Sequence, residues 1–500
     1  MADFDVVIVG AGLSGIGAAY HLQRDCPSKS YAIVESRDAI GGTWDLHRYP
    51  GIRSDSDMHT LGYGFKPWIA EQAIADGPSI LEYVNETADE NDIREHILFG
   101  RKVESASWSS HDATWTLRIG RSDAEDATTG EETISCRFLL MCSGYYSYES
   151  PHRPHFEGEE DFEGAIFHPQ LWPGELDYRG KRVVVIGSGA TAMTLVPAMA
   201  DDVEHIVMLQ RSPTYVISRP DVDVVANILR RILPEKLAYR ITRFKNAELQ
   251  RRLYEKTRRS PDKVKAFLLG DARKRLRPDY DFEKHFTPKY DPWDQRLCLI
   301  PNADLFEAIN SGKASVVTDQ IDRLTKKGIR LASGEELEAD IIISATGLEM
   351  KFLGGVGFSV DGQPVHFPDT VTYKGMMYSD VPNLIQTFGY TNASWTLRAD
   401  LTAEYTCRLL NHMDQLGARQ CTPRLRDQDR DMPRRPWIED FSAGYMQRAM
   451  ALFPKQGDRA PWLNTQSYAA DKKMIRGAPV EDDVLVFEGA KGSSAQGDSE

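Results

Sequence analysis

Apolar residues gather in short runs that are typical of buried parallel strands. FDVVIV at residues 4–9 is followed by a glycine-rich turn and a helical segment, and YAIVES at 31–36 returns as a second strand. This order is that of a βαβ unit. A second unit begins with KRVVVIGSGATAM at 181–193 and continues to HIVMLQRS at 205–212. The pattern predicts an α/β protein with two doubly wound dinucleotide-binding (Rossmann-like) domains.

Between residues 222 and 290 the pattern changes to a helical period. Apolar residues recur at Leu229, Leu233, Leu237, Ile241 and Phe244, with many Lys and Arg between them. We expect a helical insertion here, and we interpret the basic residues as a solvated face. Further along, LEADIIISATG at 337–347 predicts another strand that ends in a glycine turn.

Composition narrows the class of protein. The chain has 500 residues, of which 41% are hydrophobic and 27% charged, and a net charge of −14. The negative charge argues against a nucleic-acid-binding surface, and no apolar run is long enough for a transmembrane segment. The N-terminus enters a strand at once, so we expect a cytoplasmic protein without a signal peptide. The six cysteines include no Cys-x-x-Cys, and the His residues suggest no metal site.

The first glycine loop has the spelling Gly-x-Gly-x-x-Gly, from Gly10, Gly12 and Gly15. These glycines allow a tight turn, the approach of a pyrophosphate and close packing of helix on strand. The phosphate then meets the N-terminus of the helix. Glu35 ends the next strand, where an acidic side chain accepts hydrogen bonds from a ribose. The acid favours an unphosphorylated ribose, so FAD or NAD rather than NADP.

The second glycine loop has the spelling Gly-x-Gly-x-x-Ala and begins with Gly187 and Gly189. Ala190 and Thr191 follow at the start of the helix and belong to the expected site. The next strand ends in Arg211 and Ser212 without an acid. An arginine here can pair with a 2′-phosphate, and the serine can donate a hydrogen bond to it, which predicts NADP(H). The alternative for Arg211 is an ordinary surface arginine.

The segment between the two loops contains FEGAIFHPQLWPG, residues 162–174. It resembles the linker fingerprint of the type I Baeyer–Villiger monooxygenases, whereas related flavin-containing monooxygenases typically lack the Trp-Pro ending. The matching residues are Phe162, Gly164, His168, Trp172 and Pro173. The resemblance implies that His168 couples domain movement to catalysis, and that Trp172 and Pro173 stiffen the linker.

A second signature, GGTWDLHRYPGIRSD at 41–55, resembles the family segment that lies along the flavin. It places Gly42, Thr43, Trp44 and Asp55 in the expected FAD site. GYTNASWTLRADL at 389–401 is expected to contribute backbone at the flavin ring edge and to open a helix, and its spelling is most like the ethionamide-activating branch of the family.

DPWDQRLCLIPNADLF at 291–306 resembles the segment that supplies the family's catalytic arginine, here Arg296. The resemblance implies that Arg296 holds a C4a-peroxyflavin in its anionic form and that Asp55 pairs with the arginine. A fixed guanidinium suits both this anion and the oxyanion formed on attack at a carbonyl. Taken alone, Arg296 would suggest a surface or interdomain ion pair, and Asp55 a turn or a helix cap. Gln295 stands where the family often has a lysine, which bears on the strictness of NADPH over NADH.

These features predict an NADPH- and O2-dependent FAD monooxygenase that converts ketones into esters or lactones and oxidises sulfides. One alternative is an N- or S-oxygenating flavin monooxygenase that uses a hydroperoxyflavin. Another is a redox-sensing or structural protein that binds FAD without turnover. The expected domain order is FAD-binding domain, first part (1–147); linker and NADP-binding domain, first part (148–221); helical insertion (222–290); NADP-binding domain, second part (291–339); FAD-binding domain, second part (340–488); and a disordered tail (489–500).

Overall fold

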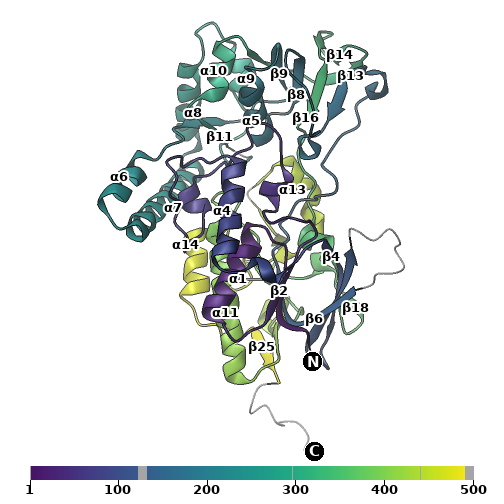
Figure 1. Cartoon of the computed structure of the whole chain (residues 1–500), viewed down its shortest axis with the longest axis vertical. Coiled ribbons are helices and arrows are strands. Elements are labelled where there is room, and N and C mark those ends of the chain that lie inside the picture. Colours follow the sequence, from purple (N-terminus) through teal and green to yellow (C-terminus); the bar gives the residue numbers. More distant parts are fainter. Residues whose placement is uncertain (1, 122–131, 296, 440, 490–500) are drawn as a thin grey trace, which may run out of the picture.

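The computed structural model describes residues 2–121, 132–295, 297–439 and 441–489. Two folds, one built on a mixed sheet and one on a parallel sheet, lie one above the other along the long axis of the molecule (Figure 1). The expected α/β class with two dinucleotide-binding folds is confirmed. Residues 490–500 of the expected tail, and Arg296, lie outside the described residues.

The first sheet is built around β1, whose residues 6–9 are buried. β1 runs parallel to both of its neighbours, β2 and β6, while the β4-β5-β6 segment is antiparallel. The strand order is β18-β17-β4-β5-β6-β1-β2-β3, and β21 also pairs with β6. The strands are β1 (Phe4–Val9), β2 (Tyr31–Val34), β3 (Ile97–Leu98), β4 (Arg101–Ser109), β5 (Thr114–Arg121), β6 (Glu132–Met141), β17 (Gly357–Val360), β18 (Gln363–Pro364) and β21 (Leu384–Gln386).

Helices α1 (Leu13–Asp25) and α11 (Trp395–Leu416) pack together on this sheet, with α4 (Gly77–Glu90) beside α1. α11 has 22 residues, of which most are buried, because it lies in the interior of the fold. It begins at Trp395, within the 389–401 segment in which the sequence predicted the start of a helix. Trp395 donates from Nε1 to Ser14 Oγ at 2.7 Å, which fixes the start of α11 beside the start of α1.

The second sheet has the order β12-β9-β8-β16-β7, and all of its strands are parallel. Helices α5 (Ala190–Met199) and α10 (Asp304–Asn310) pack on it, and a small antiparallel sheet lies beside it. The strands are β7 (Ala165–Phe167), β8 (Arg182–Ile186), β9 (His205–Gln210), β12 (Ala314–Thr318), β16 (Ile341–Ser344), β13 (Ile321–Thr325), β14 (Gly328–Leu331) and β15 (Glu336–Glu338).

The boundary expected at residue 340 is wrong for β16. We expected this strand in the first fold, but it pairs with β8 and β7 in the second sheet. Its four residues are buried, as a strand in the middle of a parallel sheet requires. The chain leaves the second sheet after Ser344, and β17 and β21 then join the first sheet.

The expected insertion at 222–290 is helical. It contains α6 (Val224–Ile232), α7 (Glu235–Arg259), α8 (Pro261–Arg275) and α9 (Phe282–Phe286). Asp223 caps α6 by accepting from the N–H of Ala226 at 3.0 Å. β10 (Val216–Arg219) and β11 (Cys298–Pro301) pair on either side of the insertion, so its two ends lie close together. α6 stands at the edge of the molecule (Figure 1).

Short elements complete the C-terminal part of the first fold. Within it, Arg398 and Asp471 form a buried ion pair, and Tyr390 donates to the same carboxylate at 2.8 Å. The remaining α-helices of the N-terminal part are α2 (Thr43–Leu46) and α3 (Met58–Leu61). The remaining α-helices and strands of the C-terminal part are α12 (Asp427–Arg430), α13 (Gly444–Ala449), α14 (Tyr468–Asp471), β19 (Thr372–Tyr373), β20 (Met377–Tyr378), β22 (Gln420–Pro423), β23 (Arg435–Pro436), β24 (Lys455–Gln456) and β25 (Leu485–Glu488). Across the described ranges, every helix is too short or too polar to cross a membrane.

Candidate active site

The first glycine loop joins β1 to α1. Gly10 has a φ of +105°, which side-chain-bearing residues rarely adopt, and a Cβ there would lie 2.7 Å from the carbonyl oxygen of Cys142. A Cβ on Gly15 would lie 1.9 Å from the carbonyl oxygen of Gly10. Gly12 instead faces Gly42, with 3.6 Å between its added Cβ and the Gly42 Cα. The fold therefore requires Gly10 and Gly15, while Gly12 and Gly42 form a bare backbone surface.

Glu35 follows β2 directly and is buried. Its Oε2 accepts from the N–H of Ala11 at 2.7 Å, and its Oε1 from the N–H of Arg37 at 2.8 Å. Burial raises the pKa of this carboxyl above its ordinary value, although both hydrogen bonds oppose the shift. The carboxylate thus holds the glycine loop at Ala11, and its remaining lone pairs can accept from a ribose.

The Gly-Gly-x-Trp signature lies against the first glycine loop. Gly42 has a φ of +56°, Thr43 is exposed at the start of α2, and Trp44 is half-buried against the first core. The hydroxyl of Tyr148 lies 3.1 Å from an added Cβ on Gly42. Burial raises the pKa of Tyr148 to about 12, while its hydrogen bond with Thr43 opposes the shift. Tyr148 is therefore a neutral phenol in a site that the sequence did not assign to it.

The continuation of this signature lies on the second fold. Tyr49 is buried in the core of the second fold, and its hydroxyl interacts with Thr191 at the second glycine loop. A Cβ on Gly51 would lie 2.5 Å from the Cβ of Ala198 on α5. Arg53 forms an ion pair with Asp304 at the start of α10. One segment therefore joins the two nucleotide loops, which sequence spacing alone could not show.

The second glycine loop leads into α5 and is open on one side. Gly187 has a φ of +136°, and a Cβ there would lie 2.4 Å from the carbonyl oxygen of Ala345. A Cβ on Gly189 would meet no described atom within 4 Å. Gly189 and Ala190 are exposed, Thr191 is half-buried, and no side chain among the described residues caps the helix. The N-terminus of α5 is thus available to a phosphate.

Arg211 and Ser212 are exposed directly after β9. Ser188, inside the second glycine loop, donates from Oγ to the carbonyl oxygen of Ser212 at 3.2 Å. This hydrogen bond holds the glycine loop to the segment that follows β9. Gln210 points inward and donates to the carbonyl oxygen of His285 at 2.8 Å. Arg211 and Ser212 are therefore the side chains at this strand end that a ribose phosphate can reach.

Most residues of the linker signature pack against the second fold. Phe162 covers Gly164, whose added Cβ would lie 2.5 Å from the Phe162 ring and 2.3 Å from the carbonyl oxygen of Asp340. Trp172 is half-buried and contacts the Phe167 ring edge-on at 5.2 Å, whereas Pro173 is exposed. The aromatic residues and the glycine thus fix the linker on the second fold.

His168 is buried in the same linker. Its Nδ1 accepts from the N–H of Gln170 at 3.1 Å, which places the proton on Nε2. Burial lowers the pKa of His168 to about 4, although its bond to the Gly347 carbonyl opposes the shift. The imidazole is neutral at pH 7 and both of its nitrogens are engaged, which fits a coupling role better than general-base catalysis.

Arg296 lies outside the described residues, so its pairing with Asp55 stays a prediction. Asp55 is exposed in the loop before α3. Asp57, not Asp55, caps α3 by accepting from the N–H of Thr60 at 3.1 Å. The alternative interpretation of Asp55 as the cap of this helix is therefore wrong.

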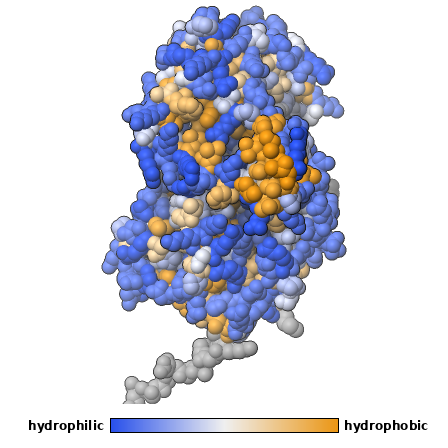
Figure 2. Space-filling view, turned by 90° about the vertical axis from the view of Figure 1, so that its left-hand side faces the viewer, coloured by the Kyte–Doolittle hydropathy of each residue, from blue (hydrophilic) through white to orange (hydrophobic). Residues whose placement is uncertain are grey.

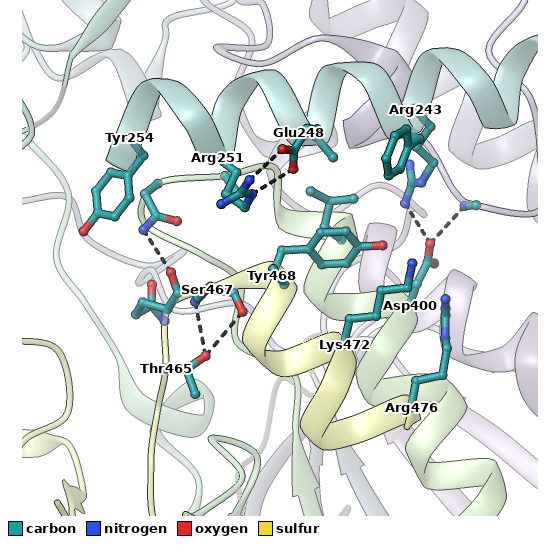
Figure 3. Close-up of a pocket in the computed structure, with 18 of the residues that line it drawn as sticks. Arg243, Glu248, Arg251, Tyr254, Asp400, Thr465, Ser467, Tyr468, Lys472 and Arg476 are labelled. Carbon is teal, nitrogen blue, oxygen red and sulfur yellow. Dashed lines mark hydrogen bonds and ion pairs between the residues drawn. The ribbon is translucent and has the colours of Figure 1, made fainter. Parts of the chain in front are cut away.

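A cavity of about 1150 Å3 lies between α7 and the C-terminal segment (Figure 3). In Figure 3, Glu248, Arg251 and Tyr254 come from α7, while Tyr468 and Lys472 approach from the opposite side. Thr391, Asn392 and Ala393 also line it, and these belong to the segment expected at the flavin ring edge. The cavity therefore borders the segment that the sequence predicted at the flavin ring edge. The sequence showed no signal for this C-terminal wall, because only tertiary packing brings it to α7.

Arg243 fixes α7 over this cavity. Its Nη2 donates to Asp400 Oδ2 at 2.9 Å, and its Nη1 donates to the carbonyl oxygens of His59, Thr60 and Gly62 at 3.0, 3.1 and 2.6 Å. Burial tends to raise the pKa of Asp400, but its hydrogen bond with His21 and the Arg243 charge outweigh burial and hold the pKa below the ordinary value. The ionised pair anchors the helical insertion to the first fold.

Among the described residues, no three His, Cys, Asp or Glu side chains are grouped so that they could hold a metal ion. All six cysteines are buried.

Comparison with known proteins gives matches over nearly the whole chain. Residues 74–354 match the family model "flavin-binding monooxygenase-like", and residues 8–71 match an NAD(P)-binding Rossmann-like domain. FAD-containing monooxygenase EthA of Mycobacterium tuberculosis is 53% identical over 97% of both chains. Probable FAD-binding monooxygenase AlmA of Acinetobacter baylyi is 47% identical over 97% of this chain and 96% of its own. A solved steroid monooxygenase bound to NADP shares the fold with a TM-score of 0.75 at 23% identity, over 95% of this chain and 97% of that one.

Proposed function

This chain belongs to the flavin-binding monooxygenase-like family, and we propose that it is an NADPH- and O2-dependent Baeyer–Villiger monooxygenase containing FAD. It inserts one oxygen atom into ketones, giving esters or lactones, and oxidises sulfides. The observation that carries the proposal is the segment around Tyr49 and Gly51, which joins the flavin signature to the second nucleotide loop. Two nucleotide sites held together in this way suit the transfer of a hydride from one nucleotide to the other.

The first loop fits FAD. The bare backbone of Gly12 and Gly42 leaves room for a pyrophosphate at the start of α1, and Glu35 stands at the end of β2 for the ribose. Thr43 and Trp44 follow Gly42 directly, in the first turn of α2. Bound FAD supplies the redox chemistry that links NADPH to O2.

The second loop fits NADPH. The open space at Gly189 and the uncapped start of α5 accommodate a pyrophosphate beside Ala190 and Thr191. Arg211 pairs with the 2′-phosphate, and Ser212 donates a hydrogen bond to it. The linker, held through His168, positions this fold against the first one.

In this proposal Arg296 supplies the fixed cation that stabilises negative charge on oxygen, and Asp55 positions the guanidinium. The ketone or sulfide binds in the cavity between α7 and the C-terminal segment, which Thr391 and Asn392 help to line. α7 is held there by Arg243, so the cavity keeps its shape next to the flavin site.

The test is a product analysis under 18O2. The purified protein, NADPH and a panel of linear, cyclic and aryl ketones are incubated in 18O2, and the products are separated by gas chromatography and mass spectrometry. We expect esters or lactones that carry one 18O atom. Oxygenation of amines and sulfides without any ester would favour the N- or S-oxygenating alternative. A protein that consumes no NADPH in air is not a monooxygenase.

A further inference from the structure

The helical insertion presents a set of large apolar side chains to solvent. Figure 2 views the side of the molecule that carries α6, and hydrophobic side chains gather there in one area surrounded by hydrophilic ones. Each side chain of this set is at least 40% exposed, and Ile232 and Phe244 reach 69% and 70%. We call this set the α6–α7 patch; it comprises Val224, Ile228, Ile232, Leu237, Ile241 and Phe244.

Spacing places these residues on one face of each helix. Val224, Ile228 and Ile232 recur every four residues on α6, and Leu237, Ile241 and Phe244 recur at intervals of four and three on α7. A continuous apolar face of this kind on a water-exposed helix marks an interaction surface.

The helical insertion that carries the patch is rich in basic residues, although the chain as a whole is acidic. Residues 224–275 contain sixteen Lys and Arg but only five Asp and Glu, against a net charge of −14 for the chain. Arg231, Lys236 and Arg240 are exposed beside the patch, and none forms an ion pair with a residue that the structure describes. The partner of this surface is therefore apolar and anionic together.

We propose that the α6–α7 patch docks the protein onto the surface of an anionic lipid bilayer. An amphipathic helix with apolar residues on one face and Arg and Lys on the other lies in the interface of a bilayer, with the apolar face among the acyl chains. Anionic headgroups attract its basic residues. A second copy of this chain is a poorer partner, because a symmetric contact would bring two sets of positive charges together.

The patch is continuous with the cavity. Leu237, Ile241 and Phe244 belong to the patch and also line the cavity. On a bilayer, the opening of the cavity therefore faces the lipid phase. If the proposed function holds, a lipophilic substrate can pass from lipid into the cavity without crossing water.

The test is flotation of the purified full-length holoprotein with lipid vesicles. One vesicle contains phosphatidylcholine alone, and the other also contains phosphatidylglycerol. We expect the wild-type protein to float with the anionic vesicles, and its partition coefficient to fall about tenfold or more in the Ile228→Glu/Ile232→Glu variant. An Arg231→Glu/Lys236→Glu variant should also bind less, and high salt should weaken wild-type binding.

Leu452→Glu is the matched control, since Leu452 is 54% exposed on a different part of the chain. It should bind like the wild type. The FAD content and melting temperature of each variant show that it is folded. Absence of wild-type binding to anionic vesicles, or equal binding to neutral ones, overturns the proposal. The proposal is also overturned if light scattering shows that the wild type forms a dimer, that the Ile228→Glu/Ile232→Glu variant does not, and that neither binds vesicles.

Discussion

His168 donates a hydrogen bond from Nε2 to the carbonyl oxygen of Gly347 at 2.9 Å. Its neighbour Gln170 donates from Nε2 to the carbonyl oxygen of Ser147 at 2.9 Å. Ser147 lies where the chain leaves the first fold, and Gly347 lies where it leaves the second. The linker thus ties together both places where the chain passes between the folds, so a movement of one fold relative to the other must act on this short segment.

The buried His168 predicts a loss of stability in acid. Its pKa is lowered to about 4 in the folded protein, from an ordinary value of 6.5. The unfolded chain therefore binds the proton first, and stability is lost as the pH falls from 6.5 towards 4. Between pH 7.5 and 5.5 the wild type should lose about 1 kcal/mol more than His168→Gln, which cannot titrate. Urea unfolding at both pH values measures this difference.

His47 offers a second group of the same kind, since burial also lowers its pKa to about 4. Adding His47→Gln should flatten the pH dependence further. Identical slopes for the wild type and both variants would show that these imidazoles titrate equally in the folded and unfolded chains.

Two glycines in the nucleotide loops should respond differently to the same substitution. In Gly15→Ala the added Cβ lies 1.9 Å from the Gly10 carbonyl oxygen, so the variant should lose about 2 kcal/mol or more and much of its FAD. In Gly189→Ala the Cβ meets no described atom within 4 Å, so stability should change by less than about 0.5 kcal/mol. The KM for NADPH should nevertheless rise, because the methyl group occupies the phosphate space. A stable Gly189→Ala variant with unchanged KM would place the nucleotide elsewhere.

The motif glycines could be predicted from sequence because the local backbone conformation requires a glycine at each of these positions. A turn with positive φ and a close contact between helix and strand both exclude a side chain, so Gly10, Gly15 and Gly187 leave a direct mark in the sequence. The same holds for the strand and helix order of each βαβ unit. These are the parts of the fold and site that the sequence predicted.

The other features of the fold and of the site depend on contacts between residues that are distant in sequence. The apolar run of β16 fits the interior of either parallel sheet, so its pattern predicts a strand but not which sheet it joins. The C-terminal wall of the cavity consists of short polar segments that gain their role only by facing α7. The contact of Tyr49 and Gly51 with α5 was likewise hidden, since the motif shows which residues recur and not what they touch.

Arg211 should separate the two nicotinamide cofactors. Arg211→Ala should raise the KM for NADPH by about tenfold or more and leave the KM for NADH nearly unchanged, because only NADPH carries the 2′-phosphate. Steady-state oxidation of each cofactor measures the effect. Arg179→Ala is the control, since Arg179 is an exposed arginine before β8, at the opposite end of the strands. An equal rise in both KM values for Arg211→Ala would refute its assignment to the phosphate.

Arg296 should be needed after reduction of the flavin and not for it. The isoalloxazine ring accepts a hydride without help from a guanidinium, whereas negative charge that develops on oxygen needs a fixed cation in a site from which water is excluded. Arg296→Ala should therefore still bleach its flavin with NADPH under anaerobic conditions. In air it should release hydrogen peroxide and form little ester, with a loss of about a hundredfold or more. Asp55→Ala should show a milder form of the same defect, because it removes only the group that positions the arginine.

Stopped-flow reduction and product yield, measured on the same samples, show whether Arg296 acts after flavin reduction. Asp57→Ala serves as the control, since the Asp57 carboxylate caps α3. Ester formation by Arg296→Ala at nearly the wild-type rate would exclude Arg296 as the cation, and the Baeyer–Villiger assignment would lose its chemical basis.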